Sequence, residues 1–219
     1  MSTGCDETRR RRGDDSLDVP VRQIRAQFDE RTIRVYQAYS DEIAEAAIAT
    51  QTFKPPFKRA RMTWIKPSFA WMMYRSGWST KAGQERILGI DILRTGFEWA
   101  LTHSSISNFD PTIHSNIEEW RKLIGQSPVR LQWDPERTIS LEGLPWRTIQ
   151  VGLGGLAVDA YIDEWIVRID DVTSLAHEID KLVARRELDA ANLRRPVERP
   201  YPLPRELASR IGCTVIGDG

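Results

Sequence analysis

The sequence predicts one α+β domain with a mixed or antiparallel sheet and flanking helices. The chain has 219 residues and a hydrophobic share of 41%, which is enough to bury one core. Short segments with alternating apolar residues, such as TIRVYQAY at 32–39 and WIVRI at 165–169, are typical of strands. Segments with helical periodicity lie between them, and no internal repeat divides the chain.

The domain is expected to occupy residues 20–195. Residues 1–19 are polar and charged, with four consecutive arginines at 9–12, which predicts a disordered leader. Residues 196–219 contain prolines at 196, 200, 202 and 204. Because proline lacks the N–H that helices and sheets require, we predict an extended C-terminal tail there.

The first part of the domain is expected to hold a strand followed by a helix. Apolar residues at 21, 24 and 28 indicate a short helical turn, and the strand TIRVYQAY follows at 32–39. Ser40 is a suitable N-cap for a helix that runs to about Gln51. The pair Pro55–Pro56 follows that helix, and a basic stretch from Lys54 to Arg61 leads into the next segment.

The segment RMTWIKPSFAWMMYRSGW at 61–78 holds three of the eight tryptophans and predicts a strand-to-helix junction. Residues 62–65 favour a strand. Pro67 has the backbone geometry of a first helical turn, so we expect a helix over 67–76. Gly77 is placed where a helix C-terminus favours a left-handed residue.

The rest of the domain shows further short elements. We expect strands at 87–93, 129–133, 147–151 and 165–169, and helices at 97–101, 117–124, 156–161 and 172–183. A loop is expected at 103–115, and Asp134–Pro135 is expected to end the second of these strands, 129–133. The motif GLGGLA at 152–157 has the spacing of a dinucleotide-binding turn, but its crossover is too short for a βαβ unit. We interpret it as a glycine turn.

Composition narrows the classes of function. Lys and Arg number 31, as do Asp and Glu, so no global charge attracts nucleic acid or an anionic membrane. Two distant cysteines, Cys5 and Cys213, and three scattered histidines indicate neither a disulfide framework nor a metal site. No apolar run reaches the roughly 20 residues of a membrane helix, and no secretion signal is recognisable. We expect a cytoplasmic protein without a metal or a membrane partner.

Cationic and aromatic residues predict a ligand site around the segment at 61–78. On the predicted helix, Trp71 and Arg75 are four residues apart, so the guanidinium can lie over the indole, with Tyr74 beside them. Lys66 precedes the helix, where an anionic ligand explains a cation better than helix energetics do. Arg61 belongs to the same basic stretch. Ordinary core packing of the aromatic residues is the alternative interpretation.

Four long blocks carry a resemblance to a known family. RQIRAQFDERTIRVYQAY, RMTWIKPSFAWMMYRSGW, PVRLQWDPER and YIDEWIVRIDDVT are similar to blocks of the bacterial and fungal domain-of-unknown-function family 4291. The similarity covers about residues 20–205 and implies a single domain. The family has no assigned activity.

A more distant resemblance is to ADP-ribosyltransferase-like folds. In those folds a strand with Arg and Tyr precedes a helix, as Arg34, Tyr36 and Tyr39 precede the helix from Ser40, and a catalytic Glu lies at a late strand that DEWIVRIDD resembles. The resemblance implies NAD as ligand, with Arg34 at its phosphates and Tyr36 or Trp71 stacked on nicotinamide. It implies Glu164 as the catalytic residue.

Two functions therefore remain open on the sequence. The first is a nucleotide-binding domain, with ADP-ribosyl transfer from NAD to an RNA or protein acceptor as its enzymatic form. The second is a non-enzymatic RNA- or protein-binding module that uses the basic and aromatic residues around 54–78.

Overall fold

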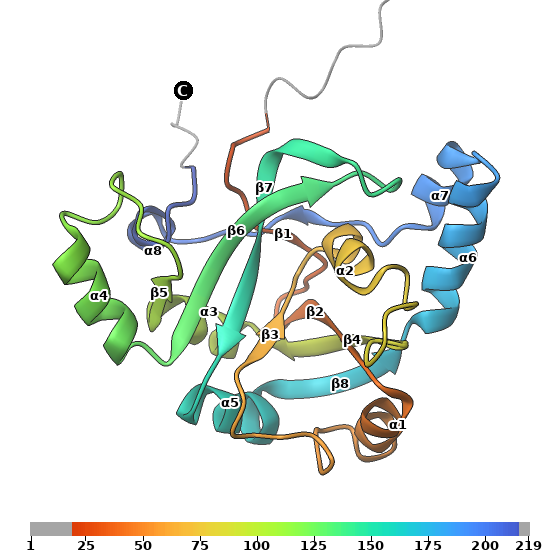
Figure 1. Cartoon of the computed structure of the whole chain (residues 1–219), viewed down its shortest axis with the longest axis horizontal. Helices are drawn as coiled ribbons and strands as arrows, with labels where there is room; N and C mark the ends of the chain where they lie inside the picture. The colour runs from red at the N-terminus through yellow and green to blue at the C-terminus, as the bar shows by residue number, and fades with distance from the viewer. Residues whose placement is uncertain (1–18, 215–219) are drawn as a thin grey trace, which may run out of the picture.

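A three-stranded antiparallel sheet forms one half of the structure. The structure is a computed structural model that describes residues 19–214. β2 (Thr32–Tyr39), β4 (Arg86–Leu93) and β8 (Ile166–Asp171) lie side by side in that order, and both pairings are antiparallel (Figure 1). The strand expected at 32–39 is confirmed to the residue.

A four-stranded mixed sheet forms the other half. Its order is β3 (Thr63–Ile65), β7 (Gly143–Leu153), β6 (Val129–Arg137) and β5 (Ser104–Ile106). β5 runs parallel to β6, and the other neighbours are antiparallel. The predicted α+β class with a mixed or antiparallel sheet is thus confirmed.

The two sheets meet at a backbone bridge between β2 and the residue that follows β3. The amide of Tyr36 donates to the carbonyl of Lys66 at 2.7 Å, and the amide of Lys66 donates to the carbonyl of Tyr36 at 3.2 Å. Within residues 19–214 no other backbone bridge joins β2 to β3. The bridge therefore fixes where a space opens between the sheets.

The helices cover both sheets. α1 (Asp41–Thr50) packs against β2, β4 and β8, whereas α3 (Arg94–Thr102) contacts both sheets. α6 (Thr173–Ala184) and α7 (Leu188–Arg194) lie together at one end of the molecule and α4 (Ile117–Gln126) lies at the other (Figure 1). α5 (Leu156–Ala160) continues directly into the π-helix η2 (Tyr161–Trp165).

α2 (Phe69–Ser76) shows how local sequence sets a helix. The Ser68 side chain accepts a hydrogen bond from the amide of Trp71 at 3.1 Å, which caps the N-terminus. Gly77 ends the helix in the left-handed conformation with φ of 60°. The helix predicted for 67–76 is confirmed, although it begins two residues later than Pro67.

Two buried clusters form the core. The larger lies between the sheets and contains apolar side chains of β2, β4, β6 and β7 together with those of α1, α3 and η2. The smaller lies around α2 and α6 and includes Tyr36, Phe69 and Met72. α2 is therefore held by core packing on its apolar face, as its periodicity predicts.

The remaining expectations differ from the structure in identifiable ways. The segment 21–28 contains β1 (Arg25–Ala26) rather than a helical turn, because it pairs with β9 (Arg199–Pro200) from the far end of the chain. β5 lies within the segment expected to be a loop, 103–115. β6 continues past Pro135, where the register shifts and the missing N–H is tolerated.

The C-terminal segment is more ordered than its prolines indicate. After β9 the chain forms α8 (Arg205–Arg210), since Pro204 directly precedes the helix instead of interrupting it. Tyr201 and Ile211 are buried in the larger core cluster. The predicted leader at 1–19 lies almost entirely outside the described residues. Among residues 19–214 no helix combines the length and the apolar character needed to cross a bilayer.

Candidate functional site

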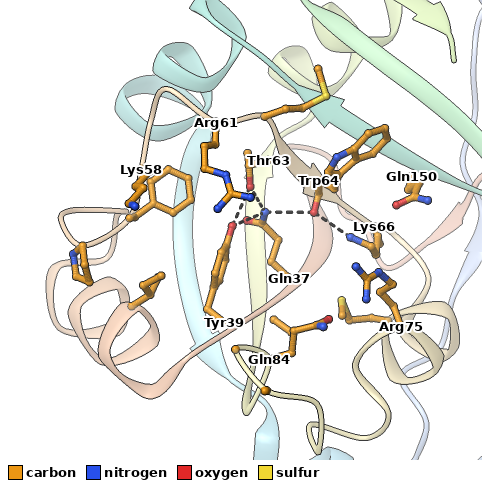
Figure 2. A pocket seen from close by; sticks show the side chains of 18 of the residues that line it. Gln37, Tyr39, Lys58, Arg61, Thr63, Trp64, Lys66, Arg75, Gln84 and Gln150 are labelled. Atoms are coloured by element: carbon orange, nitrogen blue, oxygen red, sulfur yellow. Dashed lines mark hydrogen bonds between the residues drawn. The ribbon is translucent and has the colours of Figure 1, made fainter.

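A pocket of about 720 Å³ opens where the two sheets separate beside the bridge. Its walls come from the end of β2, from β3, from α2 and from the facing strands β6 and β7. The loop before β3 and the turn at 82–84 complete it (Figure 2). A volume of this size is typical of small-molecule sites.

A hydrogen-bonded group of side chains forms the floor. Gln37 Nε2 donates to Thr63 Oγ1 at 2.6 Å and to the Trp64 carbonyl at 3.2 Å. The hydroxyls of Tyr39 and Thr63 are 2.8 Å apart, and the buried Tyr161 hydroxyl donates to Gln37 Oε1 at 2.8 Å. Figure 2 shows the contacts among Gln37, Tyr39, Thr63 and Trp64. Because every member has a partner, the floor is a rigid surface.

Four cations line the pocket, and no lining residue in the described part of the chain is a carboxylate. Lys58 and Arg61 come from the loop before β3, Lys66 follows β3, and Arg75 lies on α2. Figure 2 places the Lys66 and Arg75 side chains close together on one side and Arg61 on the other. A cavity with several cations and no internal counter-ion favours an anionic ligand.

Lys66 is the most constrained of these cations. Only 6% of it is exposed, and its ammonium donates to the Trp64 carbonyl at 3.1 Å. Burial, together with the smaller effect of the charge of Arg75, lowers the pKa of Lys66 from 10.5 to about 7. A charge of Asp134 acts in the opposite direction. The ammonium thus carries a desolvation cost that an anion in the pocket would offset.

Two carboxamides on facing strands form one wall. Gln132 of β6 and Gln150 of β7 are directly opposite each other in the antiparallel register. Gln150 Nε2 donates to Gln132 Oε1 at 2.8 Å and to Asp134 Oδ2 at 2.6 Å. Both glutamines line the pocket. The wall therefore presents neutral polar groups beside the cations.

Aromatic side chains add flat surfaces. Tyr39, Phe57 and Trp64 line the pocket. The Trp64 ring lies against Gly152 of β7, where an added Cβ would be 2.9 Å from two ring carbons. Gly152 is thus a strand residue that permits close approach of Trp64, and the turn predicted from GLGGLA is formed by the two glycines after β7.

The structure brings together four of the residues singled out from the sequence. Tyr39, Arg61, Lys66 and Arg75 all line the pocket. Side chains alternate along a strand, so Tyr39 leaves β2 on the same face as Gln37. Tyr36 leaves on the opposite face and packs edge-to-face on Phe69 of α2.

Arg34 also lies on the face opposite Tyr39. Its guanidinium donates twice to Asp91, at 2.7 Å each, and to Asp170 at 2.6 Å. These bonds, above all those with Asp91, raise the pKa of Arg34. Arg34 is outside the pocket lining, and the role at the NAD phosphates that the resemblance implied stays a prediction without support from the geometry.

Trp71 and Tyr74 are likewise outside the pocket lining. Their rings lie at an angle of 30° with centroids 5.1 Å apart. Arg137 of β6 lies over both, 3.6 Å from the Tyr74 centroid and 5.5 Å from that of Trp71. The expected partner, Arg75, lines the pocket instead. The four-residue spacing allows a contact between Trp71 and Arg75 within the helix, but in the fold Arg137 of β6 lies over the Trp71 ring.

Glu164 is exposed in η2 and is not a lining residue of the pocket. Its neighbour Asp163 forms a two-bond pair with Arg59, at 2.6 Å each. The N-terminus of α2 is also occupied from within the chain, because Glu198 accepts from the amide of Phe69 at 2.6 Å. The N-terminus of α2 therefore already has a hydrogen-bond partner from within the chain.

Replacing Arg34 with alanine tests its assignment as a structural residue. We expect a loss of about 1–3 kcal/mol in the free energy of unfolding, because Asp91 and Asp170 lose their shared cation. Affinity for any ligand of the pocket should stay within about twofold of the wild type, as Arg34 does not line it. Chemical denaturation and calorimetric titration measure the two quantities. A stable variant that loses ligand affinity would reverse the assignment.

Three functional candidates were missed on the sequence, namely Gln37, Gln132 and Gln150. Gln37 could have been found, since it continues the buried face of Ile33 and Val35 with a polar residue. Gln132 and Gln150 carry no local signal, because only the pairing of β6 with β7 makes them neighbours. Within residues 19–214 no group of three or more His, Cys, Asp and Glu could hold a metal ion.

Comparison with known proteins gives a family without an activity. A family model described as "Domain of unknown function (DUF4291)" matches residues 23–201. No curated protein matches the chain.

Proposed function

We propose that this chain, which belongs to the DUF4291 family, binds a nucleotide or a closely related phosphorylated small molecule in the pocket between its two sheets. The proposal combines three properties of one cavity. The cavity has the size of a nucleotide site, its charged lining residues are all cations, and aromatic faces suited to stacking a base lie among them.

The buried ammonium of Lys66 is the observation that carries the proposal. A lysine with 6% exposure and no carboxylate bonded to it destabilises the folded protein unless something compensates. A phosphate group supplies that compensation. Arg75 and Arg61 add guanidinium groups, which hold phosphate oxygens by paired hydrogen bonds.

NAD belongs to the proposed ligand class, as the resemblance to ADP-ribosyltransferase-like folds implies. Transfer of ADP-ribose also needs a group that stabilises the reacting sugar. Because Glu164 lies outside the pocket lining, we limit the proposed function to binding. Detection of nicotinamide release from NAD by the purified protein would extend it to catalysis.

The Arg61→Met variant tests the proposal against a matched control. We expect it to weaken binding of the preferred nucleotide about tenfold, the size of one charge-assisted hydrogen bond. Arg59→Met removes the same charge two residues away, but Arg59 is held by Asp163 and Asp159 outside the pocket. Its affinity should stay within about twofold of the wild type.

Calorimetric titration of ADP, GDP, UDP, NAD and inorganic pyrophosphate supplies the affinities. Equal losses in the Arg61 and Arg59 variants would show that the bound anion follows surface charge instead of the pocket. Absence of binding by every member of the panel would refute the proposal.

A second candidate function, RNA binding, has one favourable observation. Lys54, Lys58, Arg59 and Arg61 are all exposed within one short stretch. Such a surface predicts affinity for single-stranded RNA that falls steeply with salt and depends on Arg59 as much as on Arg61. The two arginine variants therefore separate the two functions.

A further inference from the structure

The carboxamides of Gln132 and Gln150 have their orientations fixed by a carboxylate. Asp134 Oδ2 accepts a hydrogen bond from Gln150 Nε2 at 2.6 Å. Burial raises the pKa of Asp134, and the smaller effects of the Gln150 bond and of the charges of Arg147, Lys66 and Arg137 act in the opposite direction. Since an ionised carboxylate only accepts hydrogen bonds, it holds the nitrogen of Gln150 toward itself.

The orientation of the Gln150 carboxamide in turn sets that of Gln132. The second hydrogen on Gln150 Nε2 is donated to Gln132 Oε1 at 2.8 Å. Both hydrogens of Gln150 are then in use, and its Oε1 remains an acceptor. The Oε1 of Gln132 is occupied, and its Nε2 remains a donor. Gln150 Oε1 and Gln132 Nε2 have no hydrogen-bond partner among the described residues. Neither atom is fully buried.

The pocket wall consequently presents a donor and an acceptor side by side. Both residues line the pocket, and they leave β6 and β7 at directly opposed positions. Figure 2 draws the Gln150 carboxamide on the same side of the pocket as Lys66. The pair therefore lies within reach of a ligand whose anionic group contacts Lys66.

We propose that Gln132 and Gln150 recognise a ring or side group that carries a hydrogen-bond acceptor next to an N–H donor, so that the pocket selects a nucleobase or a carboxamide-bearing ring. Gln132 Nε2 donates to the acceptor, and Gln150 Oε1 accepts from the N–H. This inference rests on the proposed nucleotide function and narrows it, because phosphate groups alone offer no such edge.

A hydrogen-bond acceptor next to an N–H donor occurs on the edges of particular chemical groups. Adenine, guanine, cytosine and uracil each carry an acceptor next to an N–H group, and so does the carboxamide of a nicotinamide ring. Sugars and polyphosphates lack it. A site built to bond such an edge also rejects analogues without it, since the oriented carboxamides would be left unpaired. Asp134 is a positioning residue in this arrangement and need not touch the ligand.

Replacing Gln132 with methionine removes the donor without changing charge or much volume. We expect the Q132M variant to bind the preferred member of the nucleotide panel about tenfold more weakly, as for a lost hydrogen bond that leaves a partner unpaired. Inorganic pyrophosphate, which engages the cations alone, should bind within about twofold of the wild type. The difference between the two ligands is the readout, because a general disturbance of the pocket would weaken both.

A change in the ligand gives the same test without a variant protein. Methylation of the edge N–H of the preferred nucleotide removes its bond to Gln150 Oε1 and should reduce affinity for the wild-type protein to a similar extent. The inference is overturned if pyrophosphate and the nucleotide lose affinity equally in Q132M, or if the methylated analogue binds the wild type undiminished. In either case, tight binding of pyrophosphate would still support the proposed anion site. If neither pyrophosphate nor any nucleotide binds the wild-type protein, both the proposed function and this inference are refuted.

Discussion

Replacing Lys66 with methionine is expected to raise the free energy of unfolding by a few kcal/mol at and below pH 7. The gain should shrink as the pH rises toward 10. Methionine fits the same space without a charge, and the Trp64 carbonyl keeps its bond from Gln37. The expected gain is large because Lys66 is buried and no carboxylate is bonded to its ammonium.

The sign follows from proton binding by the two states. The pKa of Lys66 is about 7 in the folded protein, against its ordinary value of 10.5, so between these values the unfolded chain binds more protons. Stability of the wild type therefore rises with pH across this window. Below about pH 7 both states are protonated, and the folded state bears the full cost, at about 1.4 kcal/mol per unit of pKa.

Urea denaturation at pH 6, 8 and 10 measures this effect. Lys58→Met is the matched control, because Lys58 lines the same pocket but is exposed, and its variant should differ little from the wild type at any of these pH values. A Lys66→Met variant with a pH-independent stability difference would contradict the prediction. The neighbouring charges that act on Lys66 are Arg75 and Asp134, so both must remain unchanged in the experiment.

Ligand binding offers a second readout of the same group. If a phosphate requires the protonated ammonium, the affinity of the wild type falls as the pH rises through 7, by at most tenfold per unit. A bound phosphate also raises the pKa of Lys66 toward its usual range. The Lys66→Met variant should bind more weakly and should lose this part of the pH dependence.

Local signals in the sequence predicted several of the elements around the pocket. They did not predict the elements that form only by pairing with distant parts of the chain. Alternation defined β2, and Pro67 and Gly77 indicated the ends of α2 to within two residues, because caps and periodicity depend only on near neighbours. β1 and β5 were missed, since each is a strand only through its partner, β9 or β6. A two-residue strand has no periodicity of its own.

Site residues that lie within one segment were found from the sequence, whereas those that depend on contacts between distant strands were missed. Arg61, Lys66 and Arg75 were found because they cluster within one segment. Arg34 and Tyr36 were grouped with Tyr39 by the resemblance to ADP-ribosyltransferase-like folds, although alternation along β2 places them on the other face. The contact of Arg137 with Trp71 and the pairing of Gln132 with Gln150 depend on how distant strands meet. No spacing rule within one segment could reveal either contact.

Replacing Gly96 with alanine is expected to destabilise the protein by roughly 2 kcal/mol or more, even though alanine is the better helix former. Gly96 is buried in α3 against the face of Trp165, and an added Cβ would be 2.4–2.6 Å from three atoms of that indole. Trp165 is itself buried beside Trp99 and Tyr161. The overlap therefore forces a rigid ring to move within a packed core.

Gly125→Ala is the control with the opposite sign. Gly125 is exposed near the end of α4, and an added Cβ would meet nothing within 4 Å. We expect a gain of about 0.5–1 kcal/mol from helix propensity and reduced freedom of the unfolded chain. Urea denaturation of the two variants compares the signs directly, and equal effects would contradict the packing argument.

The Gly96→Ala substitution should also weaken ligand binding in the pocket. Trp165 belongs to the same π-helix as Tyr161, and the two rings are in contact with centroids 6.5 Å apart. The hydroxyl of Tyr161 donates to Gln37 Oε1, which fixes the carboxamide at the centre of the pocket floor. A displaced Trp165 shifts η2 and loosens that bond, so Gly96→Ala should weaken nucleotide binding below its melting temperature, whereas Gly125→Ala should not. Unchanged affinity in a destabilised Gly96→Ala variant would show that the floor is held by β2 and β3 without help from η2.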